Sequence, residues 1–419
     1  MVAYTFYEGD NRVRRYAETL VKRGDHVDAI VLRRKGQTPF EIVKGVHVYR
    51  IQERVRDESG PFSYLTKLLS FFVRSAWTLA VHHFKARYGV VHVHSVPDFE
   101  VFASIVPRLT GAKVLLDIHD IVPELYAGKF KINQASRLFQ LLVLAERLSA
   151  RFAHHVIIAN HVWQDRLITR SVPAEKCTTI LNYPDPAIFY RRPRSDAYKG
   201  DFVLCYPGTL SWHQGVDLII SAMGRLSTRV PNLRLLVLGD GAEREKLRTL
   251  ARENGIEDRV TILGGVPMED VARTMANVDL GVEPKRKHSF ANEALSTKIP
   301  EFMAMDVPVV ASDTMVHKLY FPEMVEFFES ENVDDLSDKI LKLVEDEKAR
   351  QALRERGRRF IAANNWDIKK YEYLNLIDRL TRPGHPTCET PITGEDAKAP
   401  GTQVTPPQSS AAWQIISDS

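Results

Sequence analysis

Cysteine is scarce in this chain of 419 residues: Cys177, Cys205 and Cys388 are its three cysteines, and no two of them stand in a C-x-x-C spacing. An odd, widely spaced set argues against a disulfide framework or a zinc cluster. The spacing of the histidines does not support a metal site either, so we expect none. It also predicts a reducing compartment, and therefore a cytoplasmic protein, either free or peripheral on the cytoplasmic face of a membrane.

Long apolar runs are also lacking. No uncharged stretch approaches the roughly 18 residues that a transmembrane helix needs, and the most apolar segment, residues 62–81, is interrupted by Lys67 and Arg74. The first residues turn polar almost at once and lack the apolar core of a signal peptide. The sequence therefore predicts a chain that does not span a membrane.

The charge is small overall, +4, but unevenly distributed. Residues 1–200 hold 30 basic and 19 acidic side chains, whereas residues 201–419 hold 27 and 34. A basic first half predicts an anionic partner, and composition leaves nucleic acid and an acidic membrane open. Read as a helix, residues 62–88 either lie in a membrane interface or bury their apolar stripe against a sheet. The stripe comprises Leu65, Leu68, Leu69, Phe72 and Trp77, with Lys67, Arg74, Lys85 and Arg87 nearby.

Short β-branched runs alternate with longer periodic segments, which is typical of βα units and a parallel sheet. The expected strands of the first half are 2–7, 27–33, 46–51, 90–94, 112–118 and 155–160, with helices near 11–23, 62–87, 98–110, 133–153 and 161–170. Those of the second half are 201–208, 233–239, 260–263, 279–282, 307–312 and 325–329, followed by a last helix near 366–381. We expect an N-terminal domain over 1–192 and a C-terminal domain over 193–382. The last helix of the C-terminal domain is expected to pack back onto the N-terminal domain. The Pro-, Gly-, Ser- and Thr-rich tail, 383–419, reads as disordered.

The segment 290–310 carries the most chemical information. Glu293 and Glu301 stand eight positions apart, and between them Ser296 or Thr297 can cap a helix that has Pro300 in its first turn. Free amides and a positive dipole at such a start suit a phosphate, while the two carboxylates suit sugar and ribose hydroxyls. An isolated pair of glutamates at this spacing would instead be a solvated helix face.

The Glu-x₇-Glu spacing followed by the VPVV strand resembles the signature of family 4 retaining glycosyltransferases, and the likeness runs through residues 1–380. It implies an α/β GT-B fold: two facing Rossmann-like, doubly wound parallel-sheet domains with a cleft between them. It also implies that Glu293 contacts the donor sugar, that Glu301 contacts the ribose, and that the backbone at Leu295, Ser296 and Thr297 holds the diphosphate.

His119 ends the run LLDIH, where the resemblance implies a side chain beside the transferred sugar, so we assign it with Glu293 to catalysis. After Gly208 the family has Arg and then Lys, but this chain has Thr209 and Gln214. We expect the replacing charge from residues near the motif. The remaining candidates for binding the nucleotide sugar are Lys285, Arg286 and Lys298, besides Gly208 and Gln214 themselves.

These features predict a retaining hexosyltransferase of polysaccharide or glycolipid synthesis. It would use a nucleotide-diphosphosugar donor and a saccharide or lipid-linked acceptor, with no cofactor or metal and no nucleic acid. A membrane surface remains a candidate partner. The alternatives are a sugar-nucleotide 2-epimerase of the same fold, and a non-catalytic sugar-nucleotide-binding protein.

Overall fold

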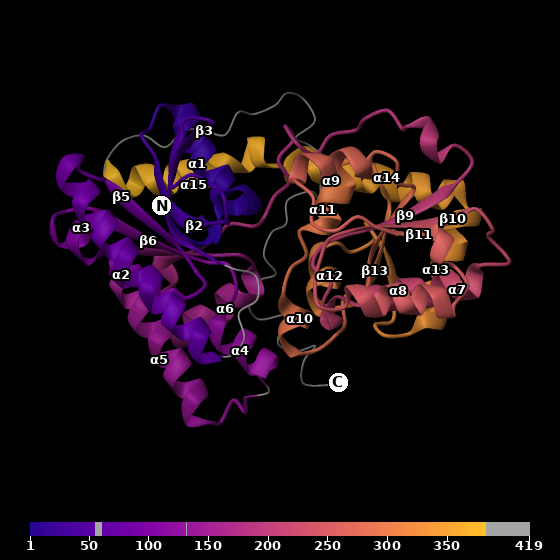
Figure 1. Cartoon of the computed structure of the whole chain (residues 1–419), viewed down its shortest axis with the longest axis horizontal. Helices are drawn as coiled ribbons and strands as arrows, with labels where there is room; N and C mark the ends of the chain where they lie inside the picture. Colours follow the sequence, from indigo (N-terminus) through magenta and orange to yellow (C-terminus); the bar gives the residue numbers. More distant parts are fainter. Residues whose placement is uncertain (55–60, 131, 383–419) are drawn as a thin grey trace. The chain divides into compact units, whose positions relative to one another are not determined.

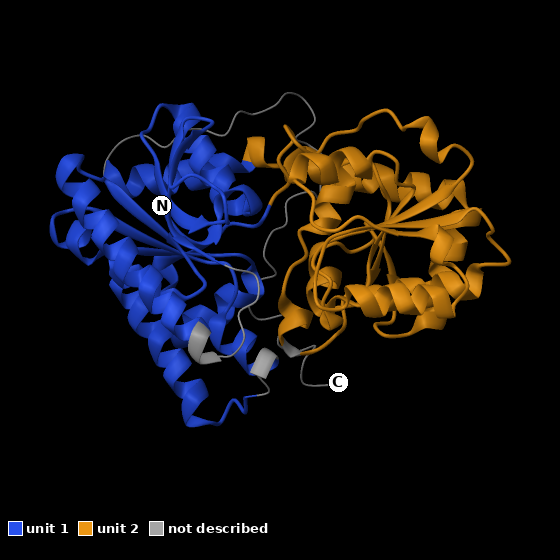
Figure 2. Ribbon diagram, viewed as in Figure 1, with its two compact units in different colours: residues 1–182, 369–389 blue, residues 183–368, 390–419 orange. Residues whose placement is uncertain are grey.

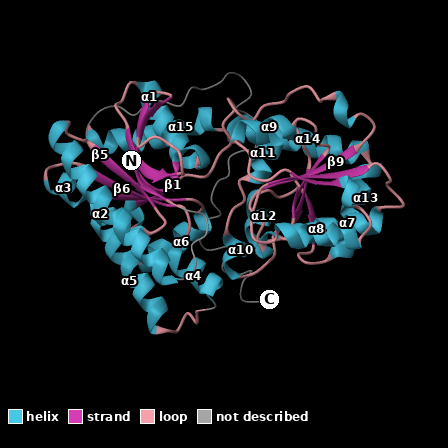
Figure 3. Cartoon of the chain, in the orientation of Figure 1, coloured by secondary structure: helices cyan, strands magenta, loops and turns pink. Residues whose placement is uncertain are grey.

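The computed structural model describes residues 1–54, 61–130 and 132–382 (Figure 1). The predicted disorder of the tail lies outside these residues. Within them the chain forms two compact units, residues 1–182 with 369–382 (unit 1) and residues 183–368 (unit 2), each a sheet covered by helices (Figures 2 and 3). No helix among the described residues has the length and apolar character required to cross a bilayer.

Unit 1 contains an eight-stranded sheet in the order β3-β4-β2-β1-β5-β6-β7-β8. Every neighbouring pair is parallel except β3 and β4. The strands are β1 (Val2–Phe6), β2 (Asp28–Arg33), β3 (Phe40–Val43), β4 (Val46–Glu53), β5 (Val90–His94), β6 (Lys113–Ile118), β7 (His155–Ile158) and β8 (Cys177–Thr179). The helices are α1 (Asn11–Arg23), α2 (Pro61–Lys85), α3 (Ile105–Leu109), α4 (Val122–Phe130), α5 (Arg137–Phe152), α6 (His161–Arg170) and most of α15 (Trp366–Thr381).

Unit 2 contains a six-stranded, fully parallel sheet in the order β11-β10-β9-β12-β13-β14. Its strands are β9 (Phe202–Pro207), β10 (Leu233–Leu238), β11 (Val260–Ile262), β12 (Leu280–Glu283), β13 (Val309–Ser312) and β14 (Glu326–Phe328). Its helices are α7 (Val216–Leu226), α8 (Arg244–Glu253), α9 (Met268–Met275), α10 (Ser289–Glu293), α11 (Lys298–Ala304), α12 (Met315–Tyr320), α13 (Val333–Glu345) and α14 (Glu347–Ala363). The predicted α/β class and doubly wound topology are confirmed in both units.

The strand order reverses between β1 and β5 in unit 1 and between β9 and β12 in unit 2. Ligands of doubly wound sheets bind outside the carboxyl ends of the strands at such switch points. The topology therefore directs the search for a site to the loops that follow β1, β5 and β6 in one unit and β9 and β12 in the other.

All twelve predicted strands are present, but two further ones, β3 and β8, were not anticipated. Strand β3 is exposed at the edge of the sheet and joins β4 through Lys44 and Gly45, which both have positive φ and so form the tight two-residue turn of a hairpin. The predicted helix over 98–110 is divided into a 3₁₀ turn, η2 (Asp98–Ser104), and the short α3. Pro107 has no N–H to continue a regular ladder through this segment.

The boundary between the units lies ten residues before the expected one, at 182/183 rather than 192/193. The intervening segment, residues 183–192, is bonded to unit 2: the Pro184 carbonyl accepts from the Trp366 amide at 2.9 Å. Just beyond it, Arg194 pairs with Asp279 at 2.6 Å. Helix α15 enters unit 1 from Lys369 onward, where Tyr373 is buried and stacks on Tyr16.

A buried ion pair joins three parts of unit 1. The Arg12 guanidinium donates from Nε and Nη2 to both carboxylate oxygens of Asp117, at 2.7 and 2.8 Å, and from Nη1 to the Ile180 carbonyl and to Asn182 Oδ1, at 2.9 and 3.0 Å. Arg12 reaches this position because Asp10 caps α1 by accepting from the amides of Arg12 and Val13. The pair links α1 to β6 and to the segment after β8. Arg12 is therefore engaged by groups inside unit 1.

We expect Asp117→Asn to destabilise unit 1 by about 3–5 kcal/mol, because it leaves the buried Arg12 charge without its carboxylate. Urea unfolding followed by circular dichroism measures this loss. Glu355→Gln is the matched control: it breaks the Glu355–Arg359 pair on α14, whose side chains are 57% and 64% exposed, and should cost about 0.5 kcal/mol or less. Equal shifts of the urea midpoint in the two variants would contradict the role of the Arg12–Asp117 pair.

Candidate functional site

Three polar side chains meet at the carboxyl edge of the unit 1 sheet. His94 ends β5, Asp117 stands opposite it on β6, and His119 follows β6 directly. His94 Nδ1 lies 3.1 Å from His119 Nε2 and 3.2 Å from Asp117 Oδ2, and His119 Nε2 lies 3.4 Å from the same oxygen. His94 and Asp117 are buried, whereas the His119 side chain is 20% exposed. His119 is thus positioned by the other two residues and accessible to a ligand.

The electrostatics of this cluster depend on Asp117. Burial opposes its ionisation, but the Arg12 charge and the contacts with His119 and His94 hold the pKa of Asp117 well below its usual value. Burial also lowers the pKa of His119, but the Asp117 carboxylate outweighs this and raises it. For His94 burial prevails and the pKa falls. The arrangement therefore favours a protonated His119 beside a neutral His94.

The sequence analysis did not identify His94 as a site residue. The position of His94 could have identified it, because it ends a strand adjacent to the one that His119 follows. The carboxyl ends of adjacent parallel strands meet at one edge of the sheet. His92, His94 and Asp117 also lie close enough together to suggest a metal site. However, the Arg12 guanidinium already bonds both oxygens of Asp117, so this group does not fit a cation.

In unit 2, glycines bring the loop after β9 close to the ends of its neighbours. A Cβ on Gly239, which follows β10, would lie 1.7 Å from the Gly208 carbonyl oxygen. A Cβ on Gly215, whose φ is 70°, would lie 2.0 Å from the carbonyl oxygen of Pro284, which follows β12. The segment 208–215 therefore crosses the switch point at backbone contact, which a side chain at either glycine would prevent.

Lys298, the first residue of α11, lies at this crossing. Its Nζ is 3.2 Å from Glu283 Oε2 and 3.3 Å from Gln214 Oε1, and a Cβ on Gly208 would lie 2.6 Å from its Cε. Burial alone would lower the pKa of Lys298, but the carboxylate of Glu283 and the Tyr206 side chain raise it. The structure therefore brings Gly208 and Gln214 together with the ammonium group of Lys298, and all three residues were predicted to bind the nucleotide sugar.

Glu283 was not anticipated from the sequence. It is fully buried as the last residue of β12, and although burial opposes its ionisation, the charges of Lys298 and Lys285 lower its pKa. A carboxylate at the end of an otherwise apolar strand, in the run DLGVE, was the signal that could have found it.

Lys285 and Arg286 are engaged by the protein itself. Lys285 Nζ donates to the Ala294 carbonyl at 2.8 Å. Arg286 donates to both oxygens of Asp217, at 3.0 and 2.6 Å, and to Glu331 at 3.0 Å. These contacts fix the loops around the site. Arg286 pairs with two carboxylates, Asp217 and Glu331, whereas Lys298 pairs with one, Glu283, which makes Lys298 the stronger candidate for meeting a phosphate.

The motif residues lie on two short helices and the turn between them. Glu293 ends α10, and Glu301 lies in the first turn of α11. Leu295, Ser296 and Thr297 form the connection, in which Ser296 Oγ accepts from the Lys298 amide at 3.3 Å. Thr297, the N-cap residue of α11, makes no side-chain capping bond of its own.

Two family models match this chain, one in each unit. The family described as "Glycosyl transferases group 1" matches residues 190–360, and the "Glycosyl transferase 4-like domain" matches residues 9–182. The phosphatidylinositol N-acetylglucosaminyltransferase gpi3 subunit of Schizosaccharomyces pombe is 22% identical over 258 residues, which cover 61% of this chain and 53% of that protein. The chain spans about half the length of the curated relatives it matches.

Solved structures show the same fold. Sucrose-phosphate synthase from Thermosynechococcus elongatus aligns with a TM-score of 0.72 at 20% identity, over 90% of this chain and 98% of that one. HepE from Anabaena, solved with UDP-glucose, aligns with a TM-score of 0.65 at 17% identity, over 87% and 94%. Likeness at this identity establishes the GT-B fold, and the two family matches together span nearly all of both units. The chain therefore belongs to the group 1, family 4 glycosyltransferases.

Proposed function

We propose that this protein transfers a hexose from a nucleotide-diphosphosugar to an acceptor hydroxyl with retention of configuration, in glycolipid or polysaccharide synthesis. The observation that carries the proposal is the Lys298 cation at the switch point of unit 2, between Gly208, Gln214 and Glu283. The anion that would meet this cation is the diphosphate of the donor. HepE, which has the same fold, was solved with UDP-glucose. The named gpi3 relative supports a lipid-linked acceptor.

In this proposal each motif residue keeps the role that the resemblance implies. Glu293 accepts hydrogen bonds from hydroxyls of the donor sugar, and Glu301 from those of the ribose. The backbone around Ser296 holds the diphosphate. His119 contacts the transferred sugar, where a protonated imidazole can donate a hydrogen bond to a sugar oxygen. With no carboxylate assigned as nucleophile, the departing phosphate assists deprotonation of the acceptor on the same face.

We expect Glu293→Gln to lower turnover at saturating donor and Glu301→Gln chiefly to raise the donor KM, each by about tenfold or more, because an unmet hydrogen bond to a charged group costs about 1.5–3 kcal/mol. Screening labelled nucleotide sugars for binding first identifies the donor, and release of the nucleoside diphosphate then gives the rates. The variant Glu355→Gln again serves as the control. Unchanged kinetics in both motif variants would contradict the assignment.

The product formed without acceptor decides between the alternatives. An epimerised sugar as the main product would identify a sugar-nucleotide 2-epimerase. Donor binding without transfer or slow hydrolysis would identify a binding protein. Transfer to an added acceptor supports the proposal.

The family resemblance places an Arg and a Lys, here called the diphosphate clamp, where this chain has Thr209 and Gln214. Binding of the diphosphate therefore requires a substitute for these two charges. Lys298 supports this role because its ammonium lies 3.3 Å from Gln214 Oε1, beside the position where the missing lysine would act. Charge-assisted hydrogen bonds from Lys298 and backbone amides would then meet the leaving group without a divalent cation.

We expect removal of the Lys298 charge to weaken UDP binding about tenfold or more and UMP binding much less. The test variant is Lys298→Met with Glu283→Gln, because Lys298→Met alone would leave Glu283 buried without its counter-ion. Lys342→Met, at the exposed Lys342–Glu326 pair, is the control. Calorimetric titration with EDTA present measures both affinities. Equal losses for UDP and UMP would refute the clamp, and UDP binding that requires Mg²⁺ or Mn²⁺ would refute the metal-free mechanism.

Access to a lipid-linked acceptor points to docking of unit 1 on an anionic membrane. Helix α2 turns Leu68, Phe71 and Leu79 into the core, so Leu68 of the predicted stripe is buried, as the packing alternative expects. The outer faces of α2 and α5, which both pack against η2, nevertheless carry a row of exposed apolar side chains. They are Leu65, Leu69, Val73, Trp77 and Phe84 on α2, and Leu138, Leu141, Leu144 and Leu148 on α5.

Charge on the same helices favours an acidic surface. Helix α2 contains no acidic residue, and Glu146, the one acid of α5, is buried against Arg170. Exposed basic side chains border the apolar rows: Arg74 on α2, and Arg137, Arg147 and Arg151 on α5. An exposed apolar face with cations and no carboxylates is the pattern of an interfacial helix.

We expect the protein to sediment with anionic vesicles more than with neutral ones at low salt. Leu69→Gln with Trp77→Gln should reduce this binding about tenfold or more, since two apolar side chains no longer enter the interface. Leu263→Gln, at an exposed leucine of unit 2, is the control and should bind as the wild type. Equal binding to both vesicle types, or by all variants, would contradict docking through α2.

A further inference from the structure

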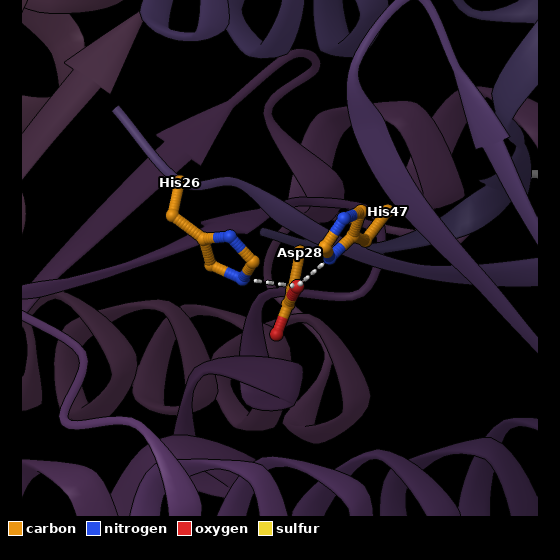
Figure 4. A group of neighbouring side chains, drawn as sticks. All are labelled: His26, Asp28 and His47. Carbon is orange, nitrogen blue, oxygen red and sulfur yellow. Dashed lines mark ion pairs between the residues drawn. The ribbon is translucent and has the colours of Figure 1, made fainter. Parts of the chain in front are cut away.

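A second group of side chains lies at the amino edge of the unit 1 sheet, opposite the edge that carries His119. Asp28 begins β2, His47 is the second residue of β4, and the register of these strands sets the two directly beside each other. His26 precedes Asp28 by two positions, the spacing that places side chains on one face of an extended chain. The fold therefore gathers two imidazoles and a carboxylate (Figure 4).

The contacts converge on a single oxygen. His26 Nε2 lies 3.0 Å and His47 Nδ1 3.4 Å from Asp28 Oδ1, from opposite sides (Figure 4). This oxygen is buried and accepts no hydrogen bond, so neither imidazole is oriented to donate one to it. Both contacts are ion pairs by distance but lack hydrogen-bond geometry, and three ligand atoms placed in this way can surround a common centre.

The other carboxylate oxygen is held separately. Tyr88 donates its hydroxyl to Asp28 Oδ2 at 2.6 Å, and His82 Nδ1 lies 3.5 Å from the same atom. A hydrogen bond to the distal oxygen fixes the orientation of a ligating carboxylate and is the usual outer partner of a metal site. Asp28 is thereby fixed with Oδ1 facing His26 and His47.

From this geometry we infer that His26, Asp28 and His47 form a binding site for a zinc-class divalent cation, with one open coordination position. Ligand bonds of about 2.0–2.1 Å around tetrahedral zinc set neighbouring ligand atoms about 3.3 Å apart, close to both measured distances. Imidazole nitrogen with one carboxylate is a donor set that suits zinc.

The surroundings of the site allow a cation to enter. The side chains of His26 and His47 are 56% and 30% exposed, so His26 can turn to bring its nitrogen onto the centre. His26, Asp28 and Tyr88 also line a cavity of about 400 Å³ at this edge of the sheet. Because parallel strands place their amino and carboxyl ends at opposite edges, the cation is remote from the groups assigned to glycosyl transfer.

The test is titration of the EDTA-stripped, untagged full chain with Zn²⁺ against a chromophoric chelator. We expect the wild type to bind one Zn²⁺ that His26→Ala with His47→Ala weakens about a hundredfold or more. His82→Ala is the matched control, because that imidazole contacts the other oxygen of Asp28, and it should retain affinity within about threefold. Visible absorption of the Co²⁺ form reports tetrahedral coordination.

Two outcomes would overturn the inference: the same Zn²⁺ stoichiometry and affinity in the wild type and the double variant, or a loss in His82→Ala as large as in the double variant. Both ligand histidines are partly exposed, so the double variant should fold, and its circular dichroism verifies this. Zn²⁺ should raise the melting temperature of the wild type and leave that of the double variant unchanged. Donor turnover should be the same in both proteins, which separates this site from the transfer reaction.

Discussion

The buried Asp117 carboxylate is the constraint on which unit 1 depends. A charge this deep in a sheet requires compensation, and Arg12 provides it from a helix 105 residues earlier in the chain while also bonding the Ile180 carbonyl. The pair thus determines where α1 and the segment after β8 lie. The same carboxylate acts on His94 and His119, so one buried acid both organises the packing of unit 1 and sets the charge of the residue assigned to the sugar.

Unit 2 repeats this solution with different residues. Glu283 is buried at the end of a strand, and Lys298 compensates it from the start of a helix. In each unit an acid–base pair is therefore held at the carboxyl edge near the switch point, where a doubly wound sheet binds its ligands. Such pairs contribute little net stability compared with apolar packing, but they fix polar groups in position before a ligand arrives.

The candidate functional groups of unit 1 lie in three separate places: the two edges of its sheet and its outer helices. The carboxyl edge carries His94, Asp117 and His119, and the amino edge carries His26, Asp28 and His47. The α2 and α5 helices carry exposed leucines bordered by arginines. This separation follows from parallel topology, because every strand presents its two ends to different edges while helices cover the faces. The cation and the membrane contact proposed above would therefore lie away from the residues assigned to the donor.

Local sequence determined much of this protein. The apolar β-branched runs specify twelve strands, Asp10 specifies the start of α1, and the spacing of Glu293 and Glu301 with Ser296 between them specifies the motif, because these features depend on residues a few positions apart. Only the tertiary structure decided which polar groups are already engaged. Arg286 is held by Asp217 and Glu331, Lys298 by Glu283, and Arg12 by Asp117, all over separations that no local pattern encodes. The register of β2 and β4 likewise places Asp28 beside His47, and the packing of α2 turns Leu68 inward and leaves Leu69 outside. Propensity and capping act along the chain, whereas the compensation of buried charge and the choice of a buried face depend on segments that only folding brings together.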